Sequence, residues 1–297
     1  MNRNFNSLHI VHWGRRAAQA LCAAAAVSMT ACGGGGESIS PAAKAPSSRD
    51  PTVDRAAALA LYESGALAAR LAQYPLSFLA QGASCVVDVG SVELHIDGSQ
   101  ANKLPTGSHT MSAAFDACLI GLNTMNGAIS GEYSLMGDYD YGAQLSVRIL
   151  GGPDLALVSG IRKVNGEGSL TLNSVSTGTV NSTDFAYTRT AAPVSGFKLV
   201  NATTGNALTF GSGSYSSSWN SASQSGSDDF NSLEVELNGA HYVIHGSIQW
   251  GYDFDWGNYY YTSGVVHITR DGVLHASISG QASGDLLVEV LLPLERL

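Results

Sequence analysis

From Cys85 to the C-terminus, hydrophobic and polar residues alternate in runs of strand length. Turn dipeptides separate many of these runs: Asp97-Gly98, Asn126-Gly127, Asn165-Gly166, Asn238-Gly239 and Asp271-Gly272. Asn-Gly and Asp-Gly between alternating runs favour β-hairpins, because the tight hairpin turn requires positive φ at its central residues. The pattern predicts a mainly β, antiparallel, hairpin-rich domain over 83–297. It would contain roughly ten to fourteen strands, as a sandwich, a curled sheet or a half-barrel.

The segment 51–82 has a different pattern, rich in alanine and leucine. Its larger apolar residues recur at helical spacing: Leu67, Leu71, Tyr74 and Phe78. Asp50-Pro51 is a suitable helix start, with a capping side chain followed by proline at the first helical position. We expect a helix over 52–73 that lies against the sheet and ends before Pro75, since proline disrupts a helix interior. Gly65 in its middle lowers the helix propensity.

An internal repeat spans much of the β region. Shifted by 115 residues, Phe115–Gly142 aligns without a gap on Phe230–Gly257, with aromatic residues at matching positions. The run Asp138-Tyr139-Asp140-Tyr141-Gly142 meets Asp253-Phe254-Asp255-Trp256-Gly257. The alignment predicts two related units, about 85–165 and 166–297, within one β domain.

The N-terminal residues have the layout of an export signal. Arg3, Arg15 and Arg16 precede an apolar run from Ala17 to Met29 that is too short for a permanent membrane span. Met29-Thr30-Ala31-Cys32 then resembles the lipobox of bacterial lipoproteins. The resemblance implies that residues 1–31 are removed, that Cys32 is lipidated with palmitate among its acyl chains, and that Gly33 directs the protein to the outer membrane. The Gly-, Ser- and Pro-rich composition of 32–50 predicts a flexible tether.

The β region resembles, more loosely, the Gly- and Asn-rich repeats of proteobacterial (Gram-negative) outer-membrane lipoproteins of unknown activity. The points of similarity are Phe115-Asp116-Ala117-Cys118 and Asn126-Gly127. The resemblance implies no enzyme family.

Net charge limits the expected binding partners, and the cysteine content indicates the redox state of the compartment. After residues 1–31 are removed, twelve basic and twenty-four acidic residues remain, a net charge of −12. A surface this acidic repels phosphate backbones, so nucleic acid is excluded as an expected partner. Cys85 and Cys118 remain beside the lipidated cysteine, and an even pair in an oxidising compartment predicts a disulfide.

An aromatic run in the second repeat is the best candidate for a ligand site. At period two, Trp250, Tyr252 and Trp256 share one face, and Tyr260 extends the run. These residues either form part of the core or make an exposed strip for sugar rings or a partner protein. A third possibility is calcium bound by Asp253 and Asp255, although Gly257 stands at the third ligand position.

Four histidines offer a weaker candidate for a metal site: His241, His245, His267 and His275. His241 and His245 share one strand face, and a three-residue hairpin with a bulge at Asp271-Gly272 would place His267 opposite His275. Neutral imidazoles on adjacent polar faces could bind zinc or copper, and solvated surface histidines are the alternative.

No catalytic, phosphate-binding or dinucleotide motif is found, and no cofactor is expected. We therefore expect a non-enzymatic lipoprotein of the cell envelope, a structural or binding module held at the outer membrane by its lipid. A glycan or an envelope protein is the expected partner. The alternatives are a glycan-binding module that uses the aromatic strip, an envelope hydrolase with catalytic residues scattered around His109, His241 or His245, and a lipid carrier.

Overall fold

The computed structural model describes residues 51–82, 85, 90–120, 123–138, 142–151, 156–159, 162–179, 182–201, 206–253 and 258–294. The predicted signal, the lipidation site Cys32, the tether and Trp256 lie outside the described residues. Within the described chain, no helix combines the length and the hydropathy that a bilayer span needs.

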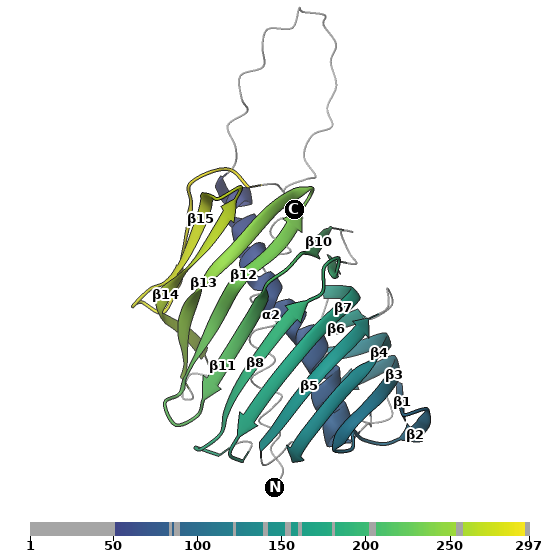
Figure 1. The fold of residues 1–297 in the computed structure, drawn as a ribbon. Helices are drawn as coiled ribbons and strands as arrows, with labels where there is room; N and C mark the ends of the chain where they lie inside the picture. The colour runs from purple at the N-terminus through teal and green to yellow at the C-terminus, as the bar shows by residue number, and fades with distance from the viewer. Residues whose placement is uncertain are drawn as a thin grey trace, which may run out of the picture.

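One antiparallel sheet of sixteen strands, backed by one long helix, makes up the described fold (Figure 1). The strands are β1 (Ser91–Ile96), β2 (Ser99–Ala101), β3 (Gly107–Ile120), β4 (Asn123–Asp138), β5 (Gly142–Gly151), β6 (Ala156–Ser159), β7 (Arg162–Thr177), β8 (Ala186–Pro193), β9 (Lys198–Asn201), β10 (Ala207–Phe210), β11 (Ser214–Asn220), β12 (Ser225–Leu237), β13 (Ala240–Asp253), β14 (Asn258–Arg270), β15 (Val273–Gly280) and β16 (Leu286–Val290). The mainly β, antiparallel prediction is confirmed. All these strands share one sheet, so they do not form a two-layer sandwich, and their number exceeds the ten to fourteen expected.

Strand order follows chain order from β16 to β12, branches in the middle, and ends with β1 between β3 and the edge strand β2. Two sets of strands connect β12 to β7. One part of each long strand is joined through β11 and β8, and the other part through β10 and β9. The edges are β16 and β2. Because of this branching, β7 and β12 each pair with different strands along their length, and the sheet stays continuous.

Three of the five turn dipeptides lie at hairpin turns, and two do not. Asp97-Gly98, Asn238-Gly239 and Asp271-Gly272 connect successive strands. Asn126 instead lies inside β4, opposite a bulge in β3, where its Oδ1 accepts a hydrogen bond from the Ala117 amide at 2.9 Å. Asn165-Gly166 lies inside β7. One of these two dipeptides lies opposite a β-bulge and the other at a closely packed position within a strand. The dipeptide alone does not distinguish such positions from hairpin turns.

Helix α2 (Pro51–Gln81) crosses the inner face of the sheet from the β15–β16 end toward the β3 end (Figure 1). It continues six residues beyond Pro75, so the predicted end before that residue is wrong. An interior proline costs about 3 kcal/mol. Burial of Leu76 and Leu79, both 0 % exposed, stabilises this last part by about 1.5–3 kcal/mol each and outweighs that cost.

Glycines allow the helix and the sheet to approach closely. A Cβ on Gly65 would lie 2.8 Å from the Cβ of Tyr215 on β11, and a Cβ on Gly166 of β7 would collide with Leu71 of the helix. Gly65 therefore lowers helix propensity but permits the contact that brings β11 onto α2.

A single hydrophobic core joins the helix to nearly the whole width of the sheet, from Leu94 on β1 to Val288 on β16. The predicted disulfide is confirmed: Cys85 and Cys118 are bonded, with Cα atoms 5.3 Å apart. It ties the chain just after α2 to the buried side of β3, where Cys118 is 0 % exposed. The sheet face that contacts α2 is called the inner face below, and the opposite face the outer face.

Two β-bulges recur at the offset of the sequence repeat. In β3 the register shifts between Phe115 and Cys118, and in β12 between Phe230 and Leu233. The left-handed residues in the bulges, Ala117 and Ser232, are also 115 apart. In each case a glycine of positive φ precedes the neighbouring strand, and a Cβ on it would meet the bulge carbonyl: Gly90 beside Ala117 and Gly213 beside Ser232.

The partner strands depart from the ungapped alignment. Phe115 pairs with Gly127, whereas Phe230 pairs with Gly246, so the second hairpin is four residues longer between equivalent pairs. The alignment of Gly131 with Gly246 is therefore shifted in space. The division into two related units stays a prediction.

Candidate functional site

The predicted aromatic strip is divided between the two faces of the sheet. Trp250 and Tyr252 lie on the inner face and are 3 % and 4 % exposed, while Tyr260 is 41 % exposed on the outer face. Trp256 lies outside the described residues. The described members therefore do not form one exposed strip. Trp250 and Tyr252 share one face, as the period of two predicts, whereas Tyr260 pairs with Gly251 and therefore lies on the opposite face.

On the inner face, these residues join a small aromatic cluster separate from the main core. Its buried members are Trp219, Trp250 and Tyr252, and Phe185, Tyr187, Tyr259 and Tyr261 pack around them. The indoles of Trp219 and Trp250 stack at 5.3 Å between centroids and 11° between planes. Arg189 lies 3.8 Å from the centroid of the Tyr187 ring, a cation–π contact. The cluster joins side chains from β8, β11, β13 and β14.

A buried carboxylate lies next to the aromatic cluster. Asp228 on β12 is 1 % exposed, and its Oδ1 accepts a hydrogen bond from the Tyr215 hydroxyl at 2.6 Å. Burial raises the pKa of Asp228 to about 6, although hydrogen bonds from Tyr215, Trp250 and Ser217 and the charge of Arg70 oppose the rise. The residue periodicity gives no indication of this group, since an Asp-Asp pair in a strand is usually solvated.

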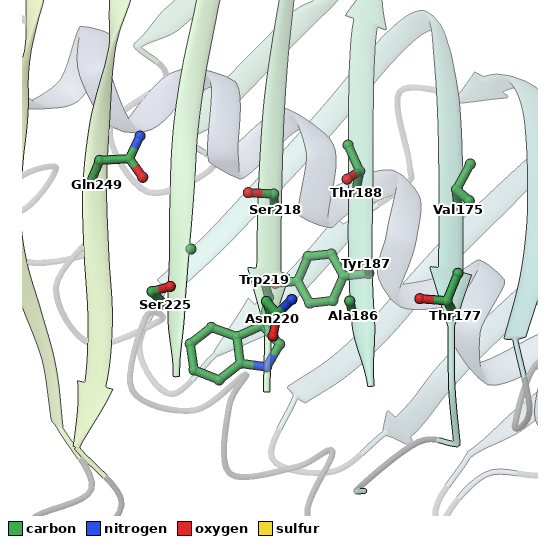
Figure 2. A pocket seen from close by; sticks show the side chains of 11 residues that line it. Val175, Thr177, Ala186, Tyr187, Thr188, Ser218, Trp219, Asn220, Ser225 and Gln249 are labelled. Atoms are coloured by element: carbon green, nitrogen blue, oxygen red, sulfur yellow. The ribbon is translucent and has the colours of Figure 1, made fainter. Parts of the chain in front are cut away.

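Directly behind the aromatic cluster, on the outer face, the strands β7, β8, β11, β12 and β13 enclose a groove of 360 Å³ (Figure 2). Side chains with hydroxyl or amide groups provide most of its walls: Thr177, Thr188, Ser218, Asn220, Ser225 and Gln249. Val175 and Ala186 complete the walls, and the inner-face residues Tyr187, Trp219 and Gly226 close its floor. No residue in this lining carries a charge.

Ordered hydroxyl groups continue from the groove across the outer face. Ser218 and Ser227 are hydrogen-bonded at 2.9 Å, and Thr190 and Ser216 at 2.8 Å. Directly opposed positions on antiparallel strands place such side chains within contact distance of one another. The result is a regular array of small polar groups held by the backbone register rather than by flexible side chains.

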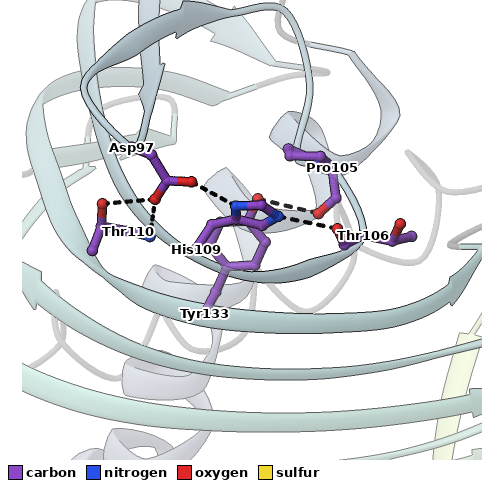
Figure 3. Close-up of polar contacts among 6 residues, drawn as sticks. All are labelled: Asp97, Pro105, Thr106, His109, Thr110 and Tyr133. Atoms are coloured by element: carbon purple, nitrogen blue, oxygen red, sulfur yellow. Dashed lines mark hydrogen bonds and ion pairs between the residues drawn. The ribbon is translucent and has the colours of Figure 1, made fainter.

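A separate cluster of polar contacts surrounds His109 on β3 (Figure 3). Its Nδ1 donates to Asp97 Oδ2 at 2.7 Å and its Nε2 donates to the Thr106 carbonyl at 3.0 Å. Both partners are acceptors, so the arrangement favours the doubly protonated ring. The hydrogen bond with Asp97, and then that with Thr106, raises the pKa of His109, while the pKa of Asp97 is lowered mainly by the same bond.

Such a histidine has no lone pair to offer as a general base. It instead fastens the β1–β2 turn to β3, and Thr110 reinforces the clamp by donating both its amide and its hydroxyl to Asp97. The hydrolase alternative therefore gains no support from His109.

The four candidate metal-binding histidines do not gather in one place. The hairpin at Asp271-Gly272 has a two-residue turn, with a bulge between Ile268 and Thr269, so His267 pairs with Ser277 and the predicted pairing with His275 is wrong. His241 lies beside Glu236, and His275 lies 2.9 Å from the Pro293 carbonyl. His245 and His267 are the two that meet, directly opposite each other on β13 and β14. Within the described ranges, no three His, Cys, Asp or Glu side chains form a metal-binding group.

The calcium alternative is only partly described, because Asp255 and Gly257 lie outside the described residues. The space that a lipid carrier would need, between the sheet and the helix, is occupied by helix side chains: Leu61, Leu71, Leu76 and Leu79 are at most 2 % exposed.

Comparison with known proteins gives no relative from which a role could be transferred: no family model matches the chain, and neither the curated proteins nor the solved structures contain a match.

Proposed function

We propose that this chain is a non-enzymatic binding module of the bacterial cell envelope, anchored by a lipid on Cys32, and that its outer-face groove binds a neutral glycan. The uncharged lining of the groove carries the proposal. Six hydroxyl or amide side chains on rigid strands offer both donors and acceptors, which is the chemistry that sugar hydroxyls require.

The acidic protein and its neutral groove together favour an uncharged ligand. A mature net charge of −12 would repel a polyanion such as a phosphorylated or uronic polysaccharide. The volume of 360 Å³ is near the lower end of the range for small-molecule sites, so a short segment of a longer glycan is the better fit.

The binding test uses Trp219 as a reporter, because it lies in the groove floor and stacks on Trp250. Neutral oligosaccharides and peptidoglycan fragments are titrated while tryptophan fluorescence and calorimetric heat are recorded. Thr188→Val and Gln249→Ala remove groove hydrogen-bonding groups and should weaken binding about tenfold each, since unpaired sugar hydroxyls lose roughly 1–2 kcal/mol apiece.

Thr190→Val is the matched control, because Thr190 lies on the same face of β8 two residues from Thr188 but outside the groove. It should leave the affinity within about twofold. Absence of saturable binding across the panel, or equal effects of the Thr188 and Thr190 variants, would refute the proposed ligand.

Anchoring is tested separately on cells that express the whole sequence. Mass spectrometry should find a diacylglyceryl-modified and palmitoylated Cys32 at the new N-terminus, in the outer-membrane fraction. Cys32→Ser should release an unlipidated chain from the membrane fraction, because acyl chains supply the membrane affinity. An intact Met1 on protein from those cells would contradict this part of the proposal.

A further inference from the structure

His245 and His267 face each other across the β13–β14 pair on the outer face of the sheet. Their neighbours along the strands, Ile244, Val266 and Ile268, are all 0 % exposed on the inner face, which fixes the outward direction of both rings. The ring centroids are 5.4 Å apart, with 47° between the ring planes.

This spacing is close to that of two imidazoles that share one metal ion. With metal–nitrogen bonds of about 2.0–2.1 Å and an angle of about 90–110°, the two ring centroids would be roughly 4.5–5.2 Å apart. The observed centroid distance of 5.4 Å exceeds the upper end of this range by only about 0.2 Å. The strands themselves need not move, because register already places the two Cα atoms directly opposite each other.

The partners of the other described histidines make this pair distinct. His95 contacts Glu93 at 2.8 Å, His109 contacts Asp97, and His275 contacts the Pro293 carbonyl, so each has an oxygen acceptor for a ring N–H. His241 lies 3.3 Å from Glu236. In contrast, Nδ1 of His267 is buried and has no hydrogen-bond partner within the described structure.

A buried ring nitrogen without a partner is least costly when it carries no proton, because a buried N–H that makes no hydrogen bond loses its solvation. An unprotonated nitrogen presents a lone pair, and a cation between the rings would satisfy it. We propose that His245 and His267 form a two-histidine site for a late divalent transition metal ion, Cu²⁺ or Zn²⁺, with water completing the coordination.

The surroundings are compatible with a cation. Ser277 lies opposite His267, and its hydroxyl donates to Glu289 on the adjoining strand at 3.4 Å. Glu289 is two strands from His267, roughly 9–10 Å at the usual strand spacing, so its charge attracts a cation from outside the first coordination sphere. On β13, Gln249 of the groove is four residues from His245, so the ion site and the groove are separate.

The test measures the binding of CuCl₂ and ZnCl₂ to the protein purified from cells that express the whole sequence. Calorimetry gives affinities, and electron paramagnetic resonance of the Cu²⁺ form gives the number of nitrogen ligands. We expect two equivalent nitrogens in the wild type, one in His245→Gln and in His267→Gln, and a loss of affinity of about tenfold or more in each.

His241→Gln is the matched control, because it removes a histidine from the same face of the same strand. It should change the affinity less than about twofold. Equal effects of all three variants, or a single nitrogen ligand in the wild type, would overturn the proposal. A measurement that needs no variant is broadening of histidine NMR signals by substoichiometric Cu²⁺: it should affect His245 and His267 before His95, and the reverse order would also overturn it.

Discussion

Replacing Gly65 by alanine sets two physical effects of opposite sign against each other. In a solvent-exposed helix, Gly→Ala stabilises by about 0.8–1.0 kcal/mol through helix propensity. Here the new Cβ would lie 2.8 Å from Tyr215 Cβ and 2.9 Å from Tyr215 Cγ, well inside the usual 3.5–4.0 Å carbon contact. Tyr215 cannot move freely, because its hydroxyl is bonded to the buried Asp228.

Overpacking of this kind costs about 1–3 kcal/mol, and it includes two contacts with the ring as well as one with Cβ. We expect the steric cost to exceed the propensity gain and Gly65→Ala to be destabilising by about 1–2 kcal/mol. For a fold of this size, that corresponds to a fall in Tm of about 2–8 °C.

Urea unfolding followed by circular dichroism measures the change. Gln73→Ala, on the half-exposed stripe of the same helix, is the control that reports propensity without a close contact. In a double-mutant cycle with Tyr215→Ala, which removes the ring atoms, the two changes should couple by about 0.5–2 kcal/mol. If Gly65→Ala raises stability as propensity alone predicts, the close packing of α2 against β11 is refuted.

Three further predictions concern covalent and titratable groups. Replacing Cys85 and Cys118 by serine should lower the free energy of unfolding by about 3–4 kcal/mol, measured by urea denaturation, because the 33-residue loop is no longer closed. The raised pKa of His109 means that its stabilisation is complete below its unfolded value of 6.5 and is lost as pH rises through the folded pKa. The lowered pKa of Asp97 means that its own contribution is present above 3.8 and is lost as pH falls through the folded value. Thermal melts of the wild type and His109→Gln should therefore differ most at mildly acidic pH and converge in alkali, and a constant difference would contradict the clamp. Asp228, with its pKa raised from 3.8 to about 6, should disfavour folding by about 2–2.5 kcal/mol more at pH 7 than at pH 4, and Asp228→Asn should remove that part of the pH dependence of the unfolding free energy.

Local patterns in the sequence predict the class of this fold well. Alternation and turn dipeptides identify an antiparallel sheet, and alanine and leucine spacing identifies the helix. The predicted end of the helix is wrong because Pro75 costs less free energy than the burial of Leu76 and Leu79 provides. That burial depends on strands distant in sequence. Tertiary packing decides this boundary, and helix propensity does not describe it.

The pairing register of the strands, which brings the site residues together, could not be predicted from the sequence. The two-residue turn at Asp271-Gly272 and an extra residue in β15, His275, together place His267 opposite Ser277, and the pairing of β13 with β14 places it opposite His245. The groove depends on hydroxyl and amide residues from five strands, two of them placed by the branching of the sheet. No periodicity within one strand carries this information.

The enclosure of α2 has a consequence for how the chain reaches its native state. The helix emerges first, yet the Leu294 amide donates to Asp54 in its first turn across 240 residues of sequence. Contacts this distant in sequence slow folding, because a long loop must be closed before they form. The first turn of α2 therefore stays uncovered until the last strands have formed. Loss of the final dozen residues removes β16 and Leu294, which contact α2, and should leave the folded protein with an uncovered helix start.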